Sequence, residues 1–154
     1  MEYVIVKWLH VLSSTVLFGT GIGSAYYMLK ASLNRDPAIA YFVVRQVVIA
    51  DWMFTATTVV VQPLTGLYLA HLMHMQLTSR WIFWSLILYF VAGACWLPGV
   101  WIQIRMRELA RDAVARQVEL PSAYWRWFRV WFALGVPAFA ALVVVFYLMV
   151  AKPL

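Results

Sequence analysis

The chain is 154 residues long, and 65% of these residues are hydrophobic while only 12% are charged. Soluble domains are typically about 45–50% apolar and about 25% charged, so this composition excludes an ordinary soluble domain. The single cysteine, Cys95, excludes a disulfide framework, and no phosphate loop, dinucleotide fingerprint or metalloprotease motif is present.

Four apolar stretches follow one another along the chain, at residues 8–29, 47–72, 81–104 and 127–150. Each reaches the roughly 20 residues that a helix needs to cross the hydrocarbon core of a bilayer. Each must be helical, because lipid cannot satisfy backbone polar groups. We therefore predict an all-α fold, in which residues 1–154 form a single integral membrane domain built as a four-helix transmembrane bundle in direct contact with lipid.

The connections between these stretches differ in character. Asp36 and Pro37 suit the N-cap and first position of a helix after a tight turn. A short polar run at residues 74–79 separates the second and third stretches. Residues 105–119 are strongly charged and largely helix-favouring, so we predict an amphipathic extension of the third helix on the cytoplasmic side.

Basic residues indicate how the bundle is oriented. Nine of the twelve flank the first and third connections: Lys30, Arg35, Arg45, Arg105, Arg107, Arg111, Arg116, Arg126 and Arg129. The positive-inside rule places these connections in the cytoplasm and both termini on the non-cytoplasmic side. We therefore attribute the net charge of +6 to basic residues at the cytoplasmic membrane surface, and we expect no nucleic-acid partner. We expect the protein in the inner (cytoplasmic) membrane of a bacterium.

Two histidines are the strongest candidates for chemistry. His10 lies about 13 Å from the middle of the first span and His71 about 17 Å from the middle of the second, on the same predicted side of the membrane. Two imidazoles on facing helices at similar height are the ligands that six-coordinate haem needs. We therefore predict non-covalent haem b, with His10 and His71 as iron ligands; an interfacial, solvated His71 is the alternative. His74, further out, is expected to be solvated.

Two further residues complete the candidate cofactor site. Ser14 follows His10 at helical spacing on a face of small residues, where a flat porphyrin or a neighbouring helix could approach. Gly19 and Gly23 form a small-xxx-small pair that is typical of helix packing. Arg80 lies on the same side of the membrane and could pair with haem propionates, although a solvated interfacial arginine is the plainer interpretation.

Other polar residues and helix-breaking prolines lie within the spans. Asp51 and Arg45 could form a salt bridge or belong to a proton path, and the salt bridge is the preferred interpretation. Pro63, Pro98 and Pro137 interrupt helices, and each frees a backbone carbonyl that must find a partner inside the bundle.

Several short motifs together resemble the HemJ-type protoporphyrinogen oxidases, and resemble more closely a related family of small predicted integral membrane proteins without an assigned function. The similarity covers most of the chain. It rests on Lys7-Trp8-Leu9-His10, Arg45, Gln62-Pro63-Leu64-Thr65-Gly66, Trp81 and Arg105-Met106-Arg107-Glu108-Leu109.

The resemblance implies a helical membrane protein that binds haem b through His10. HemJ-type proteins oxidise protoporphyrinogen during haem synthesis. This chain departs from them at Ser85, where that family has a basic residue, and at Trp96, near the place where a histidine is expected. The haem-binding expectation therefore transfers better than the catalytic one.

We predict that the protein binds haem b and takes part in electron transfer, as a subunit or partner of a membrane redox complex. One alternative is a protoporphyrinogen oxidase-like enzyme that passes electrons to quinone. A second alternative is a non-redox scaffold or assembly subunit whose histidines are incidental. Homo-oligomerisation is left open.

Overall fold

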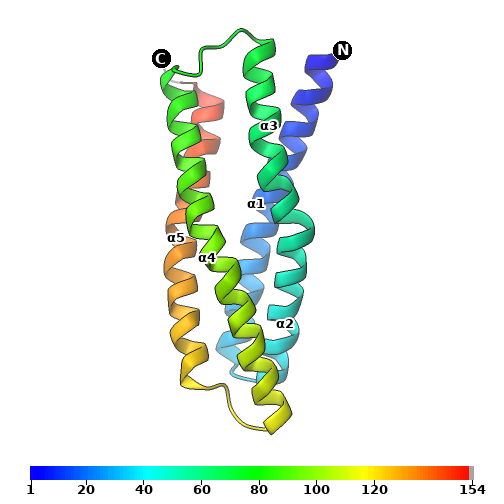
Figure 1. Cartoon of the computed structure of the whole chain (residues 1–154), viewed down its shortest axis with the longest axis vertical. Coiled ribbons are helices and arrows are strands. Elements are labelled where there is room, and N and C mark those ends of the chain that lie inside the picture. Colours follow the sequence, from blue (N-terminus) through cyan, green and yellow to red (C-terminus); the bar gives the residue numbers. More distant parts are fainter. Residues whose placement is uncertain (153–154) are drawn as a thin grey trace.

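A computed structural model describes residues 1–152, and within this range the chain is helical and contains no strand. The elements are α1 (Glu2–Asn34), α2 (Pro37–Ala50), a π-helical turn η1 (Asp51–Thr55), α3 (Ala56–Leu72), α4 (Arg80–Arg116) and α5 (Ser122–Ala151). Because α2, η1 and α3 follow one another without a break, the described chain forms four rods side by side (Figure 1).

Each of the four rods is long and apolar enough to cross a membrane. They contain 33, 36, 37 and 30 residues, and at 1.5 Å per residue they are about 45–55 Å long. This exceeds the roughly 30 Å of a hydrocarbon core, so the rods extend beyond it. The predicted all-α, four-helix transmembrane fold is confirmed. The helices are longer than the predicted spans, and α4 continues through the charged segment as far as Arg116.

The turn between α1 and α2 forms as the sequence predicts. Arg35 adopts a left-handed conformation with φ 64°. The Asp36 carboxylate then accepts hydrogen bonds from the backbone N–H of Ala38 at 2.8 Å and of Ile39 at 3.3 Å, and Pro37 occupies the first helical position. This cap stabilises the start of α2 because the first N–H groups of a helix have no partner within it.

The buried core is concentrated at the end of the bundle that holds the α1–α2 and α4–α5 connections. Met28, Val44, Met106 and Tyr124 are fully buried there. The hydroxyl groups of Ser32 in α1 and Tyr124 in α5 are 2.8 Å apart and share a hydrogen bond. Close packing at this end fixes the four rods relative to one another.

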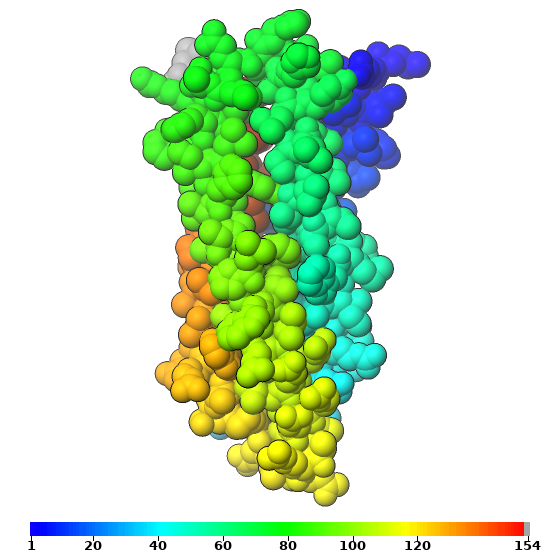
Figure 2. Space-filling view, viewed as in Figure 1, coloured from blue at the N-terminus to red at the C-terminus, as the bar shows by residue number. Residues whose placement is uncertain are grey.

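The opposite end, where α1 begins and α5 ends, is more open. α3 and α4 diverge there (Figure 1). The space-filling view shows a hollow between them, with the last turns of α5 visible at its floor (Figure 2). The glycine pair of α1 makes no close contact with another helix of the bundle, because a Cβ added at Gly19 or Gly23 would meet nothing within 4 Å. The predicted helix packing through these two glycines is therefore wrong within the described chain.

Candidate ligand-binding cavities

The hollow at the open end is a cavity of about 490 Å³, which we name the His10 cavity. All four rods contribute to its wall, and most of the wall is apolar. Polar lining residues include His10 and Ser14 from α1, Gln62 from α3, and Ser85 and Tyr89 from α4. Small-molecule and cofactor sites typically occupy about 300–1,000 Å³ and combine apolar walls with a few placed polar groups.

The imidazole of His10 is held by two side chains of α3. Its Nδ1 lies 2.8 Å from Oγ1 of Thr65, and its Nε2 lies 3.1 Å from the amide nitrogen of Gln62. The Thr65 hydroxyl donates its own hydrogen to the carbonyl oxygen of Val61 at 2.7 Å. It therefore accepts from Nδ1–H of His10, which leaves the lone pair on Nε2, where it accepts a hydrogen bond from the Gln62 amide.

Gly66 allows this close approach of α1 to α3. A Cβ added at Gly66 would lie 3.1 Å from Cε1 of His10, which is closer than an ordinary van der Waals contact. The imidazole is thus packed over a helix position that has no side chain, one turn after Gln62. Three positions of α3 together fix the plane of the ring: Gln62, Thr65 and Gly66.

Two lysines lie at the rim of the His10 cavity. The ammonium group of Lys7 is 5.6 Å from the centre of the Tyr3 ring, and that of Lys152 is 5.7 Å from the centre of the Trp81 ring. Both lysines line the cavity and both are exposed. The cavity therefore has an apolar interior and a cationic rim, a combination suited to an apolar ligand with an anionic group.

The sequence-predicted residues are divided between this cavity and the surface. His10 and Ser14 line it; the Ser14 hydroxyl donates to the carbonyl oxygen of Val11 at 2.7 Å. His71 and Arg80 are exposed and lie outside the lining. His71 follows Gln62 by nine residues, or about two and a half helical turns, and so lies on the opposite face of α3. The structure does not bring His71 and His10 together; the His71 ring stacks on Tyr68 instead, with 6.5 Å between centroids.

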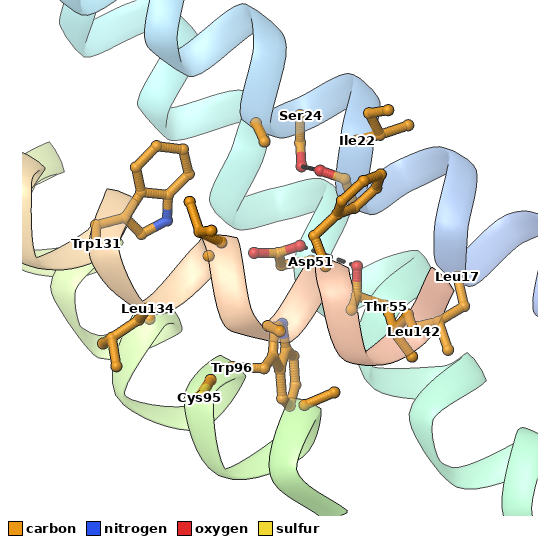
Figure 3. A pocket seen from close by; sticks show the side chains of 18 of the residues that line it. Leu17, Ile22, Ser24, Asp51, Thr55, Cys95, Trp96, Trp131, Leu134 and Leu142 are labelled. Carbon is orange, nitrogen blue, oxygen red and sulfur yellow. Dashed lines mark hydrogen bonds between the residues drawn. The ribbon is translucent and has the colours of Figure 1, made fainter. Parts of the chain in front are cut away.

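A second cavity of about 540 Å³ lies nearer the middle of the bundle, and we name it the Asp51 cavity. Its polar lining residues include Asp51 and Thr55 from η1 and Trp96 and Gln103 from α4. Figure 3 shows the Asp51 carboxyl group near the centre of this space, with Trp96 on the α4 side and Trp131 on the α5 side. The two cavities share wall residues, among them Leu17 and Tyr89.

Asp51 is 4% exposed and is held within its own helical segment. Its Oδ1 accepts a 2.9 Å hydrogen bond from the Thr55 hydroxyl, and Gln103 also faces this carboxyl group. Arg45 is exposed, and no salt bridge joins it to Asp51 in the described structure. The preferred salt bridge between Asp51 and Arg45 is therefore wrong. The offset of six residues between them amounts to about one and two-thirds turns, which directs the two side chains to different faces.

The π-helical turn sets the position of this carboxyl group. In η1 the backbone N–H of Ala56 bonds to the carbonyl oxygen of Asp51, five residues earlier. Such turns are rare and occur often at functional sites, because the inserted residue changes which side chains face inward. The sequence contains no proline or glycine between residues 51 and 55 that would have predicted it.

Four apolar rods with two cavities between them define a helical-bundle integral membrane protein. The model of a family described as predicted integral membrane protein (DUF2269) matches residues 4–153, and the chain belongs to this family. Comparison with curated proteins and with solved structures found no match.

The family match bears out the prediction of a small predicted integral membrane family, and it shows the membrane setting of the chain. The HemJ resemblance and the haem ligands stay predictions. In the described residues, no group of three or more His, Cys, Asp or Glu side chains gathers where it could hold a metal ion. A haem iron requires only one or two protein ligands, so this finding does not test the predicted haem site.

Several side chains of the His10 cavity were not predicted as site residues. Lys7 and Lys152 are far apart in sequence and meet the cavity only because α1 begins and α5 ends at the same end of the bundle. Gln62 and Thr65 could have been identified from the sequence as candidate site residues. Both are polar, lie within an apolar span and are three residues apart on one helical face.

Proposed function

We propose that this protein binds haem b non-covalently in the His10 cavity, with His10 as an axial ligand, and takes part in electron transfer in the membrane. The observation that supports the proposal most directly is the state of the His10 ring. Its Nδ1–H donates a hydrogen bond to the Thr65 hydroxyl, while Nε2 accepts a hydrogen bond from the amide of Gln62.

This arrangement resembles the way proteins prepare a histidine for a metal. Ligating histidines donate their other ring N–H to an oxygen acceptor, which fixes the tautomer and the ring orientation. Here Thr65 is that acceptor, and coordination through Nε2 would replace the 3.1 Å contact with Gln62. Bound haem would supply one-electron redox chemistry at its iron.

The walls and rim of the cavity also fit an amphiphilic porphyrin. The lining is largely apolar, as the macrocycle requires, and Lys7 and Lys152 supply cations where propionates could be neutralised. The rim lysines take the role that the sequence suggested for Arg80, which lies outside the lining.

A protoporphyrinogen oxidase-like enzyme is the second candidate, and one observation favours it. Among the described residues that line the cavity, His10 is the only histidine. A haem held there by one histidine would keep a coordination position open, which suits an enzyme more than a simple electron carrier.

Absorption spectroscopy of the detergent-purified protein, with and without dithionite, tests the proposal. We expect a Soret band in the wild type and loss of most of it in His10→Ala, with partial recovery when free imidazole is added. His74→Asn is the control, because His74 is exposed and has a φ of 51°, which asparagine tolerates. Full haem retention in His10→Ala would overturn the assignment.

A further inference from the structure

The Asp51 cavity contains two polar atoms that the protein leaves without a partner. Oε1 of Gln103 and Nε1 of Trp96 are buried and make no hydrogen bond, and both side chains line this cavity. Gln103 is only 5% exposed. A buried polar group without a partner is costly, and more so where the surroundings are lipid and apolar side chains. The pair therefore indicates a bound molecule that supplies both partners.

The chemistry of the two atoms specifies what such a molecule must offer. The indole N–H of Trp96 can only donate, so it needs an acceptor, and the amide oxygen of Gln103 can only accept, so it needs a donor. A hydroxyl group does both. The Asp51 carboxyl group, which Gln103 faces, adds a further acceptor for a hydroxyl hydrogen.

The glycines of the cavity wall leave room for a ring beside the backbone. Gly21, Gly93, Gly99 and Gly135 line it from three helices, and a Cβ added at any of them would meet nothing within 4 Å. The remaining lining is mostly apolar, so a ligand can enter from the lipid with an apolar tail. The ligand is thus a membrane-soluble ring that carries hydroxyl groups.

We propose that the Asp51 cavity binds a lipid-soluble quinol, whose hydroxyl groups meet Gln103, Asp51 and Trp96 while its ring lies against the glycines of the wall. None of these residues lines the His10 cavity, so this site stands apart from the proposed haem site. The two cavities share Leu17, Tyr89 and Leu142 in their walls. Because the polar residues of the two sites differ, a variant that loses one ligand can still bind the other.

Equilibrium binding of a decyl-chain quinol to the protein in lipid nanodiscs tests the proposal, under anaerobic reducing conditions and with empty nanodiscs subtracted. We expect saturable binding to the wild type. Trp96→Phe and Gln103→Leu each remove one hydrogen bond and should weaken binding roughly 2- to 10-fold. Trp101→Phe is the matched control on the same helix, because Trp101 is half exposed, packs edge-to-face against Trp127 and lies outside the lining.

A ligand lacking the hydroxyl donors separates specific binding from partitioning. The dimethyl ether of the same quinol should bind the wild type roughly 2- to 10-fold more weakly, and this difference should shrink in Gln103→Leu. Gly99→Leu should abolish binding by filling the cavity, whereas Gly19→Leu, which faces open space outside it, should not.

Several results would overturn the proposal. They are the absence of saturable binding to folded wild type, equal affinity for quinol and ether, or equal effects of Trp96→Phe and Trp101→Phe. Any of them would mean that Gln103 and Trp96 do not hold the hydroxyl groups of a quinol in this cavity. The helical signal in circular dichroism and the gel-filtration profile establish that each variant is folded. If Gly99→Leu does not fold, the conservative Trp96→Phe still tests the proposal. A wild type that binds quinol but shows no Soret band would overturn only the proposed haem function.

Discussion

The hydroxyl group of Tyr89 in α4 donates a 2.7 Å hydrogen bond to the backbone carbonyl oxygen of Val59 in α3. This carbonyl lies four residues before Pro63, whose nitrogen carries no hydrogen to bond it. The sequence predicts that a carbonyl freed by an intramembrane proline must find a partner within the bundle, and for Pro63 that partner is Tyr89. The bond joins α3 to α4 beside both cavities, because Tyr89 lines each of them.

Removing this hydroxyl should destabilise the bundle. We expect Tyr89→Phe to lower the free energy of unfolding by about 0.5–1.5 kcal/mol, because the Val59 carbonyl is left without a donor in an apolar setting. Reversible unfolding in detergent micelles measures the change. Tyr147→Phe, at a residue that is 66% exposed, is the control and should have little effect. Equal stability of the two variants would show that Val59 finds another donor.

The contact of Gly66 with His10 gives a second prediction. Alanine normally stabilises a helix relative to glycine by about 0.5–1 kcal/mol. At Gly66 this gain should be lost or reversed, because the new methyl group meets the His10 ring at 3.1 Å while Thr65 and Gln62 hold that ring in place.

Gly19→Ala is the matched comparison, since its Cβ would enter open space. We expect its free energy of unfolding to exceed that of Gly66→Ala by about 1 kcal/mol or more. A shifted or weakened Soret band in Gly66→Ala alone would further support the placement of haem beside His10. Identical stability and spectra in the two variants would mean that the ring moves freely.

The sequence predicts the membrane fold well because composition and span length decide it. The Asp36 cap was also predictable, since it depends on neighbouring residues. The same cap places the start of α2 at Pro37, ten residues before the apolar stretch that hydropathy marks. Ala40 and Val44 in those residues are fully buried in the core, so packing against other helices extends α2, and hydropathy alone does not reveal it.

The candidate site was predictable in part. His10 could be selected as a polar residue in an apolar span, but its partner Thr65 is 55 residues away and depends on how two helices are rotated. Height along a span predicts His71 as a partner for His10, yet height does not fix the face of the helix. Asp51 was recognised as an intramembrane acid, whereas the π-helical turn that directs it inward has no local sequence signal.

Orientation in the membrane yields a third prediction. The start of α1 and the end of α5 lie at one end of the bundle, and the connections rich in lysine and arginine lie at the other (Figure 1). By the positive-inside rule, a reporter inserted at Ala115 should be active in the cytoplasm, and one fused after residue 154 should be active outside it. The reverse pattern would place the His10 cavity at the cytoplasmic side.

The last prediction separates the two histidines. The sequence suggested His71 as the second iron ligand, which would make the haem six-coordinate and low-spin, and His71→Ala would then give a high-spin, carbon monoxide-binding form. The structure directs His71 to the face of α3 opposite Gln62, where it is exposed and stacked on Tyr68. We therefore expect His71→Ala to leave the spectrum of the purified protein unchanged, while His10→Ala loses it. Carbon monoxide binding by the reduced wild type would show an open coordination position and favour the enzyme, whereas a wild type that stays low-spin in His71→Ala would take its second ligand from the cavity wall, where Met73 and Met75 lie. A low-spin wild type that becomes high-spin in His71→Ala would restore the paired-histidine ligation. It would require α3 to rotate when the cofactor binds, and would favour the electron carrier over the enzyme.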